Sequence, residues 1–119
     1  MIIKKATKKD IPILLKFMMD LQEFEQGFCD RVRADSKARD LFENGFIKKR
    51  ITNPDYLFLI AWEGNQPAGI ISGWKEYVSY AYKNEYVALI CQLIVDPEFR
   101  GKGVGKKLVE KITEEFRNI

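Results

Sequence analysis

The chain has 119 residues and a mass of 13.9 kDa, which is enough for one domain and too little for two. Its composition, 46% hydrophobic and 31% charged, is typical of a globular protein with its own core. The chain contains no histidine, which excludes serine–histidine triads, cysteine–histidine proteases and most zinc hydrolases. We therefore expect a single domain over residues 1–119 that binds no metal.

Neither a membrane segment nor a disulfide is expected. The longest apolar run, Tyr56 to Trp62, has seven residues, whereas about 18 are needed to span a bilayer. The N-terminus lacks the pattern of a secretory signal, so we expect a cytoplasmic protein with no membrane partner. Cys29 lies in a polar segment and Cys91 in an apolar one, which predicts two free thiols. The net charge of +3 is too small to imply nucleic-acid binding by itself.

The first half of the chain predicts a strand and two helices. After a β-like opening over residues 1–5, Thr7 and Asp10 have the spacing of a capping box, and Gly27 is a plausible helix end. A second helix is expected from Asp35 to just before the Asn53-Pro54 pair, with an interruption at Gly45. The apolar stripes of the two helices are Ile11, Leu14, Leu15, Met18 and Leu21, then Ala38, Leu41, Phe42 and Phe46.

The second half predicts three strands and a helix. Tyr56 to Trp62 and Ala68 to Tyr77 flank turn residues and should form a hairpin. Glu85 to Val95 is apolar on both faces, which favours a central strand over an edge strand. A closing helix has the stripe Leu108, Val109, Ile112 and Phe116. This order predicts an α+β (mixed α/β) domain, a mostly antiparallel sheet flanked by helices.

A glycine-rich basic segment, Arg100 to Lys107, follows the last strand and opens the last helix. Such a position presents unpaired backbone N–H groups and the positive end of the helix dipole. Five of the twelve residues from Arg100 to Lys111 are Lys or Arg. The segment therefore suits an anion, and a pyrophosphate fits it well. A basic, solvated helix entry is the alternative interpretation.

Two familiar phosphate motifs do not match this segment. A P-loop has four residues between its first glycine and Gly-Lys-Ser/Thr, and here no Ser or Thr follows Lys106. A dinucleotide fold has Gly-x-Gly-x-x-Gly and a second βα unit, whereas the spacing here is Gly-x-Gly-x-Gly. Both nucleotide hydrolysis and dinucleotide binding are disfavoured.

The run from Val95 to Leu108 resembles the acyl-coenzyme A signature of the GNAT family of acetyltransferases. Arg100, Gly103 and Gly105 match its Arg/Gln-x-x-Gly-x-Gly/Ala core. The resemblance extends to residues 6–11, similar to the family's first strand-to-helix step, and to residues 68–73, similar to its third strand. It implies a GNAT-like acyl-CoA N-acyltransferase fold with acetyl-CoA as co-substrate. The coenzyme-binding residues it implies are Leu93, Val95, Arg100, Gly101, Lys102, Gly103, Val104, Gly105 and Lys106.

The resemblance also implies direct attack of an amine on the thioester, with the backbone near Leu93 polarising the carbonyl. Family members often carry an acidic residue on this strand, where this chain has Cys91 and Gln92, so the catalytic base and acid are unassigned. Cys91 is expected to be an inert core residue. Candidate contacts of a small-molecule or peptide amine acceptor are Glu23, Glu25, Asp30, Tyr77, Tyr80 and Tyr82.

Compared with the family, the sequence stops before the last strands and a tyrosine-bearing helix, so we expect a C-terminally truncated fold. The edge of the strand at residues 85–95 and the stripe of the last helix would then lack cover, which predicts a homodimer. Acetyl-CoA-dependent N-acetylation of an amine is the expected activity. The alternatives are a non-catalytic acyl-CoA-binding or interaction module and, more remotely, a nucleic-acid binder that uses the basic loop.

Overall fold

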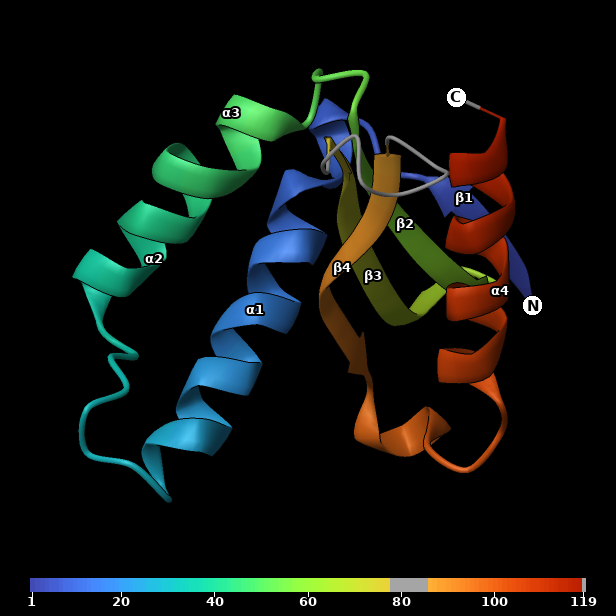
Figure 1. Cartoon of the computed structure of the whole chain (residues 1–119). Helices are drawn as coiled ribbons and strands as arrows, with labels where there is room; N and C mark the ends of the chain where they lie inside the picture. The colour runs from blue at the N-terminus through green and yellow to red at the C-terminus, as the bar shows by residue number, and fades with distance from the viewer. Residues whose placement is uncertain (78–85, 119) are drawn as a thin grey trace.

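A four-stranded antiparallel sheet forms the centre of the computed structural model, which describes residues 1–77 and 86–118. The strands stand side by side in the order of the sequence, with every neighbouring pair antiparallel. One group of helices covers one face of the sheet and the last helix covers the other (Figure 1). The strands are β1 (Ile2–Lys5), β2 (Tyr56–Glu63), β3 (Gln66–Tyr77) and β4 (Tyr86–Val95). The sheet flanked by helices confirms the expected fold class.

The first helical layer begins where the capping spacing predicted it. The Asp10 carboxylate accepts hydrogen bonds from the Thr7 backbone N–H at 2.9 Å and from the Thr7 hydroxyl at 3.2 Å. A 3₁₀ turn, η1 (Lys8–Asp10), leads into α1 (Ile11–Gln26), which ends at Gly27. Leu14, Leu15 and Met18 of its apolar stripe are buried against the sheet.

The second helix contains a π-helical turn at the predicted interruption. It consists of α2 (Ser36–Phe42), the π turn η2 (Glu43–Ile47) and α3 (Lys48–Arg50). Ala38 and Ile47 are buried and Phe42 is half-buried, but Leu41 is 56% exposed, so its assignment to the core stripe was wrong. At about 100° per residue, Leu41 and Phe42 point to opposite sides of Ala38, and the sheet lies on the side of Phe42.

The hairpin is also confirmed. β2 and β3 are joined by a tight turn in which Gly64 has a φ of 60°. β3 ends at Tyr77 as expected, whereas Tyr80 and Tyr82 lie outside the described residues.

The prediction that the strand ending at Val95 is central was wrong. Within the described part of the chain, β4 has one neighbour, β3, and its far edge is unpaired. An apolar run usually marks a strand covered on both faces. Here much of that apolar surface is exposed, at Val87 (40%), Leu89 (39%), Ile90 (47%) and Leu93 (44%).

The last helix, α4 (Val104–Arg117), packs its stripe into the second core rather than leaving it uncovered. Leu108 and Ile112 are almost completely buried against Leu57, Leu59 and Ile71 of the sheet. The expectation that this stripe would be exposed was therefore wrong, because the sheet itself covers it. None of the helices in residues 1–77 and 86–118 is long and apolar enough to cross a bilayer.

β3 and β4 approach each other closely at a bulge. From Ser72 to Gly73, β3 advances by one residue while β4 advances by two, from Gln92 to Ile90, so Cys91 is the extra residue. A Cβ atom on Gly73 would lie only 2.4 Å from the Leu89 carbonyl oxygen. Glycine is therefore required at this position, as it often is beside a bulge.

Replacing Gly73 with alanine should destabilise the fold, because the Leu89 carbonyl would have to move. We expect Gly73→Ala to lower the free energy of unfolding by about 1–3 kcal/mol in urea titrations. Gly45→Ala is the matched control, since its Cβ would come no closer than 4.0 Å to a neighbouring atom, Leu41 Cδ2. Equal stability of the two variants would contradict the close approach.

The homodimer stays a prediction, and the unpaired, apolar edge of β4 supports it. Unpaired edges with apolar side chains pair readily with other chains. We expect sedimentation at micromolar concentration to detect a dimer, and Ile90→Lys to shift it towards monomer. A well-folded monomer of the unmodified chain would contradict this prediction.

Candidate functional site

The chain turns from β4 into α4 through a short loop. Asp96 begins the 3₁₀ turn η3 (Pro97–Phe99), and its carboxylate accepts the Glu98 backbone N–H at 2.9 Å. Gly101 and Gly103 then adopt positive φ angles of 77° and 79°, a conformation that suits glycine. A Cβ at either glycine would meet no atom within 4 Å, so the backbone here faces open space.

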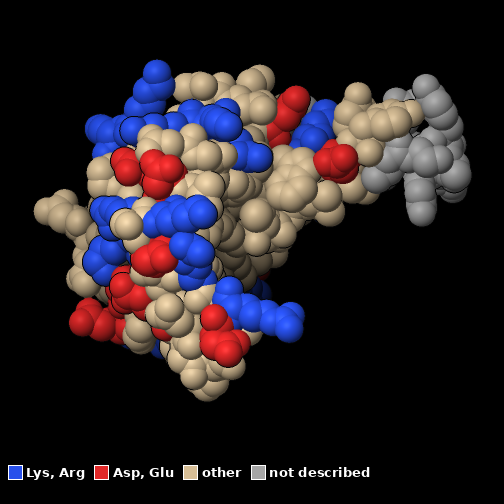
Figure 2. All heavy atoms as spheres, turned by 90° about the vertical axis from the view of Figure 1, so that its left-hand side faces the viewer, with Lys and Arg blue, Asp and Glu red and all other residues tan. Residues whose placement is uncertain are grey.

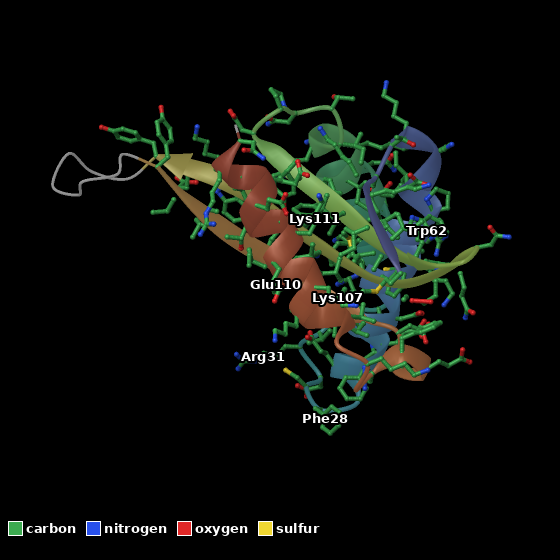
Figure 3. All side chains as sticks on the ribbon, turned by 90° about the vertical axis from the view of Figure 1, so that its right-hand side faces the viewer. Phe28, Arg31, Trp62, Lys107, Glu110 and Lys111 are labelled. Carbon is green, nitrogen blue, oxygen red and sulfur yellow. The ribbon has the colours of Figure 1, made fainter. Side chains whose placement is uncertain are left out.

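The first turn of α4 offers backbone donors to an anion. Lys107 N–H donates to Gly103 O at 3.1 Å, so the three preceding amides, at Val104, Gly105 and Lys106, have no acceptor within the helix. Arg100, Lys102 and Lys106 are exposed around them. Lys107 and Lys111 extend the basic character along α4, with Glu110 beside them (Figure 3). Backbone N–H donors, the positive end of the helix dipole and basic side chains therefore combine at the N-terminus of α4.

Gly105 connects the first turn of α4 to the strand edge. A Cβ at Gly105 would lie 3.7 Å from Val95 Cγ2 and 3.9 Å from Leu93 Cδ2, so the first turn of α4 rests against the end of β4. The structure thus brings together all of the residues expected to bind the coenzyme. They are Leu93 and Val95 on β4, Arg100, Gly101, Lys102 and Gly103 in the loop, and Val104, Gly105 and Lys106 in α4.

The β4 bulge lies four residues before Val95 and carries an unexpected polar cluster. Cys91 is exposed, so its assignment as an inert core residue was wrong: it lines a hollow on the face of the sheet that α1 and the second helix cover, instead of lying within the core. Ser72 is buried, and its hydroxyl donates to Gln92 Oε1 at 3.2 Å. Tyr56 is 5% exposed, and its hydroxyl has no hydrogen-bond partner among the described residues.

The Tyr56 hydroxyl stays protonated in this environment. Burial is the main cause that raises the pKa of Tyr56 well above its usual value. Ser72, Cys91 and Arg50 are polar or charged side chains near enough to influence this pKa. The hydroxyl can therefore donate one hydrogen bond and accept others from a ligand that reaches it.

A hollow of about 430 Å³ opens over Tyr56 and Cys91, and we call it the Tyr56 hollow. It is formed by the end of the second helix, the start of β2 and the bulge region of β3 and β4. Its lining residues are Phe46, Arg50, Asn53, Asp55, Tyr56, Trp74, Lys75 and Cys91.

The acidic and aromatic candidates for acceptor binding do not come together. Glu23 lines a separate groove of about 530 Å³ with Asp96 and Arg100, at the Val95 end of β4, and Glu25 follows on the same last turn of α1. Tyr77 lies at the other end of β4, where its ring is 5.7 Å from the ring of Tyr86. At about 3.3 Å per residue, these ends are about 30 Å apart. Asp30 is exposed in the loop after α1, and Tyr80 and Tyr82 are outside the described residues.

Sequence reasoning missed Tyr56, Ser72 and Arg50 as possible site residues. Tyr56 was assigned to an ordinary apolar strand, and its position beside Cys91 depends on pairing across three strands. The glycine within the apolar strand, Gly73, was the available signal for a bulge. No cluster of three or more potential metal-ligating residues occurs within residues 1–77 and 86–118.

The charged surface on the side of α1, α2 and α3 mixes both signs. Figure 2 shows Lys and Arg interspersed with Asp and Glu over this face. Lys16 with Asp20 and Lys48 with Glu43 are two of its ion pairs, at 2.7 Å and 3.7 Å. This face therefore does not present the single-sign patch that a nucleic-acid backbone favours.

Comparisons with known proteins relate the chain to acetyltransferases. Residues 16–119 match the acetyltransferase (GNAT) family. Thialysine N-ε-acetyltransferases of Bos taurus and Sus scrofa are 27% and 26% identical over 117 and 121 residues, which cover 94% and 95% of the chain. The matched region is 65% of each relative, so the chain spans just under two thirds of the length of these curated relatives.

Solved structures share the fold. An acetyltransferase from Vibrio fischeri superimposes with a TM-score of 0.76 at 22% identity, covering 99% of this chain and 88% of that one. An acetyltransferase from Clostridium acetobutylicum, solved with acetyl-CoA, gives a TM-score of 0.77 at 21% identity, covering 99% and 75%. These similarities confirm the GNAT-like fold expected from the sequence. Since the family match extends over most of its length, the chain belongs to the acetyltransferase (GNAT) family.

Proposed function

We propose that the chain binds acetyl-CoA and transfers its acetyl group to a primary amine. The observation that carries this proposal is the unpaired edge of β4, which leads directly into the glycine loop and the open first turn of α4. Strand edge and helix N-terminus together suit a ligand with a long amide-containing arm and a pyrophosphate. The acetyl-CoA in the Clostridium acetobutylicum structure supports the same assignment.

Each part of the proposed site has a physical role. The amides of Val104, Gly105 and Lys106 would bind the pyrophosphate, with Arg100 and Lys102 adding positive charge. Backbone groups of Leu93 and Val95 would pair with the pantetheine arm as an added strand does. Because Gly101 and Gly103 have no side chains, the loop backbone would be able to approach the phosphate oxygens closely.

Acetyl-CoA would supply the acetyl group as a reactive thioester. The bulge at Cys91 interrupts the β3–β4 ladder, and a backbone N–H freed there would polarise the carbonyl. As the amine attacks, a C–N bond forms and the C–S bond breaks. The amine loses one proton, and the coenzyme A thiolate leaves and takes up one proton to become the free thiol. The side chains at the bulge, Cys91, Gln92 and Tyr56, would hold the amine in place.

The proposal also includes the kind of acceptor, the cellular location and the oligomeric state. The named acceptor of the Bos taurus and Sus scrofa relatives, the N-ε amine of thialysine, supports an amine acceptor for this chain. Among the acceptor contacts expected from the sequence, Glu23, Glu25 and Tyr77 lie away from the bulge, and the Tyr56 hollow is the nearer candidate. We further propose a cytoplasmic homodimer.

A second candidate is an acyl-CoA-binding module without catalysis. It is favoured by Cys91 and Gln92, which stand where related enzymes often carry an acidic residue. Binding of the coenzyme without turnover would distinguish this candidate from the enzyme.

Coenzyme binding should depend on the charge at Gly103. Asp and Asn have nearly the same shape and both tolerate positive φ, so Gly103→Asp and Gly103→Asn form a matched pair. We expect calorimetry to show acetyl-CoA binding at least about tenfold weaker for Gly103→Asp, because its carboxylate would repel the pyrophosphate. Equal affinity of the two variants would contradict the proposed loop contact.

Thiol release from acetyl-CoA should require an added amine. The neutral amine is the nucleophile, so the rate should rise with pH towards the pKa of the amine, about 10.4 for a lysine side chain. A thiol-detecting assay at several pH values measures this dependence. Thiol release at the same rate with and without the amine would contradict acetyl transfer to an amine. Binding of acetyl-CoA without thiol release would support the acyl-CoA-binding module.

A further inference from the structure

The bulge places an exposed thiol on the edge strand. Cys91 is the extra residue of the β4 bulge, and its side chain is exposed. It lines the Tyr56 hollow together with Tyr56 and Trp74, on the face of the sheet that α1 and the second helix cover. Because β4 has an unpaired edge within the described part of the chain, the thiol lies next to both the hollow and this edge.

The proposed path of the coenzyme passes this thiol. Leu93 and Val95 are the residues proposed to pair with the pantetheine arm, and Cys91 precedes Val95 by four residues, about 13 Å along an extended strand. The thioester at the end of the arm would then lie at the bulge. A nucleophile held at that position gains a large rate advantage from its placement alone.

The Tyr56 hydroxyl is a hydrogen-bond donor beside the sulfur. Tyr56 is 5% exposed, and its hydroxyl has no hydrogen-bond partner among the described residues. Burial raises the pKa of Tyr56 most, and the interactions with Cys91 also raise it. Ser72 and Arg50 act in the opposite direction, but the net pKa is well above the usual value. The hydroxyl therefore keeps its proton and can donate it to the sulfur as negative charge develops there.

The charge around the thiol also favours such a reaction. Among the described residues that line the hollow, Arg50 and Lys75 are cations and Asp55 is the one anion. The guanidinium carbon of Arg50 lies 5.8 Å from the centroid of the Tyr56 ring. A positive environment stabilises the negative charge that builds up when a thiol attacks a carbonyl.

We propose that Cys91 accepts the acetyl group of bound acetyl-CoA and becomes S-acetylated when no amine is present. The Cys91 sulfur attacks the thioester carbonyl, a C–S bond to Cys91 forms, and the C–S bond to coenzyme A breaks. Cys91 loses one proton, and the coenzyme A thiolate leaves and takes up one proton. Tyr56 acts as a positioning residue that orients the sulfur. This inference rests on the proposed function, because it requires acetyl-CoA to lie along β4.

Mass spectrometry of the unmodified chain, incubated with acetyl-CoA and then digested, measures the modification of both thiols in one sample. Cys29 is the internal control, because it is also exposed but does not line the hollow. We expect Cys91 to gain an acetyl group at least about tenfold faster than Cys29, at a rate that saturates with acetyl-CoA. Equal rates at the two thiols, or no acetylation of Cys91, would overturn the proposal.

The chemistry of the bond is tested by its removal. The step exchanges one thioester for another, so an excess of free coenzyme A should take the acetyl group back from Cys91. Neutral hydroxylamine should also release it, whereas an acetyl group on a lysine side chain would remain. An acetyl group that resists both reagents would overturn the assignment to the Cys91 sulfur.

Substitutions test the two contacts on which the step depends. Tyr56→Phe removes only the hydroxyl, and at saturating acetyl-CoA it should slow acetylation of Cys91 about two- to tenfold. Gly103→Asp should slow it about tenfold at low acetyl-CoA, relative to the matched Gly103→Asn, because the coenzyme binds less tightly. Neither change should affect Cys29. An unchanged rate in Tyr56→Phe would overturn the role of the hydroxyl, and equal rates in the Gly103 pair would overturn the bound coenzyme as the donor.

Failure of the proposed function gives a different result. If calorimetry detects no binding of acetyl-CoA, both the proposed function and the Cys91 step are wrong. If acetyl-CoA binds and Cys91 stays unmodified, the Cys91 step alone is overturned. Acetylation of Cys91 releases at most one coenzyme A per chain, whereas transfer to an added amine continues to release it, so one thiol assay separates the two activities.

Discussion

The close approach of β3 and β4 at Gly73 is the constraint on which the candidate site depends. With a Cβ position 2.4 Å from the Leu89 carbonyl oxygen, these strands can meet only where β3 lacks a side chain. The bulge at Cys91 follows directly beside this contact. It shifts the alternation of β4, so that Leu89 pairs with Trp74 on one face while Leu93 pairs with Ile71 on the other.

This shift connects the two parts of the site. Beyond the bulge, Leu93 and Val95 face α4 and rest against Gly105, which joins the strand edge to the first turn of α4. At the bulge, Cys91 joins Tyr56 and Trp74 around the hollow on the opposite face of the sheet. A coenzyme along the edge of β4 would thus have its phosphates at one end and an acceptor amine near the other. The glycine loop and the Tyr56 hollow are separated by a few residues of one strand.

The sequence predicted the local features of this arrangement well. The capping pair at Thr7 and Asp10, the hairpin turn at Gly64 and the glycine loop before α4 are all encoded by neighbouring residues, and local rules predict them. The GNAT resemblance came from the same loop. Gly45 marked the interruption of the second helix, although its π-helical form was not predicted.

Features that depend on pairing between distant segments were not predictable in the same way. The apolar composition of β4 predicted a central strand, but β4 lies at the edge of the sheet in the described residues. Composition does not reveal which strand edges are covered by another strand. The apolar neighbours of Cys91 predicted a core position for the same reason, and the bulge that exposes it depends on the fit of Gly73 against Leu89. Arg50 meets Tyr56 only through the packing of the second helix on the sheet.

The central claim is that acetyl-CoA lies along β4 from the bulge to the glycine loop. Amide chemical shifts of the isotopically labelled chain, recorded during titration with acetyl-CoA, test it most directly. The account predicts large shifts for residues 91–95 and 101–106 and small ones for β1 and the start of α1. Shifts confined to the groove between α1 and the loop, at Phe17, Leu21 and Phe24, with β4 unaffected, would contradict it.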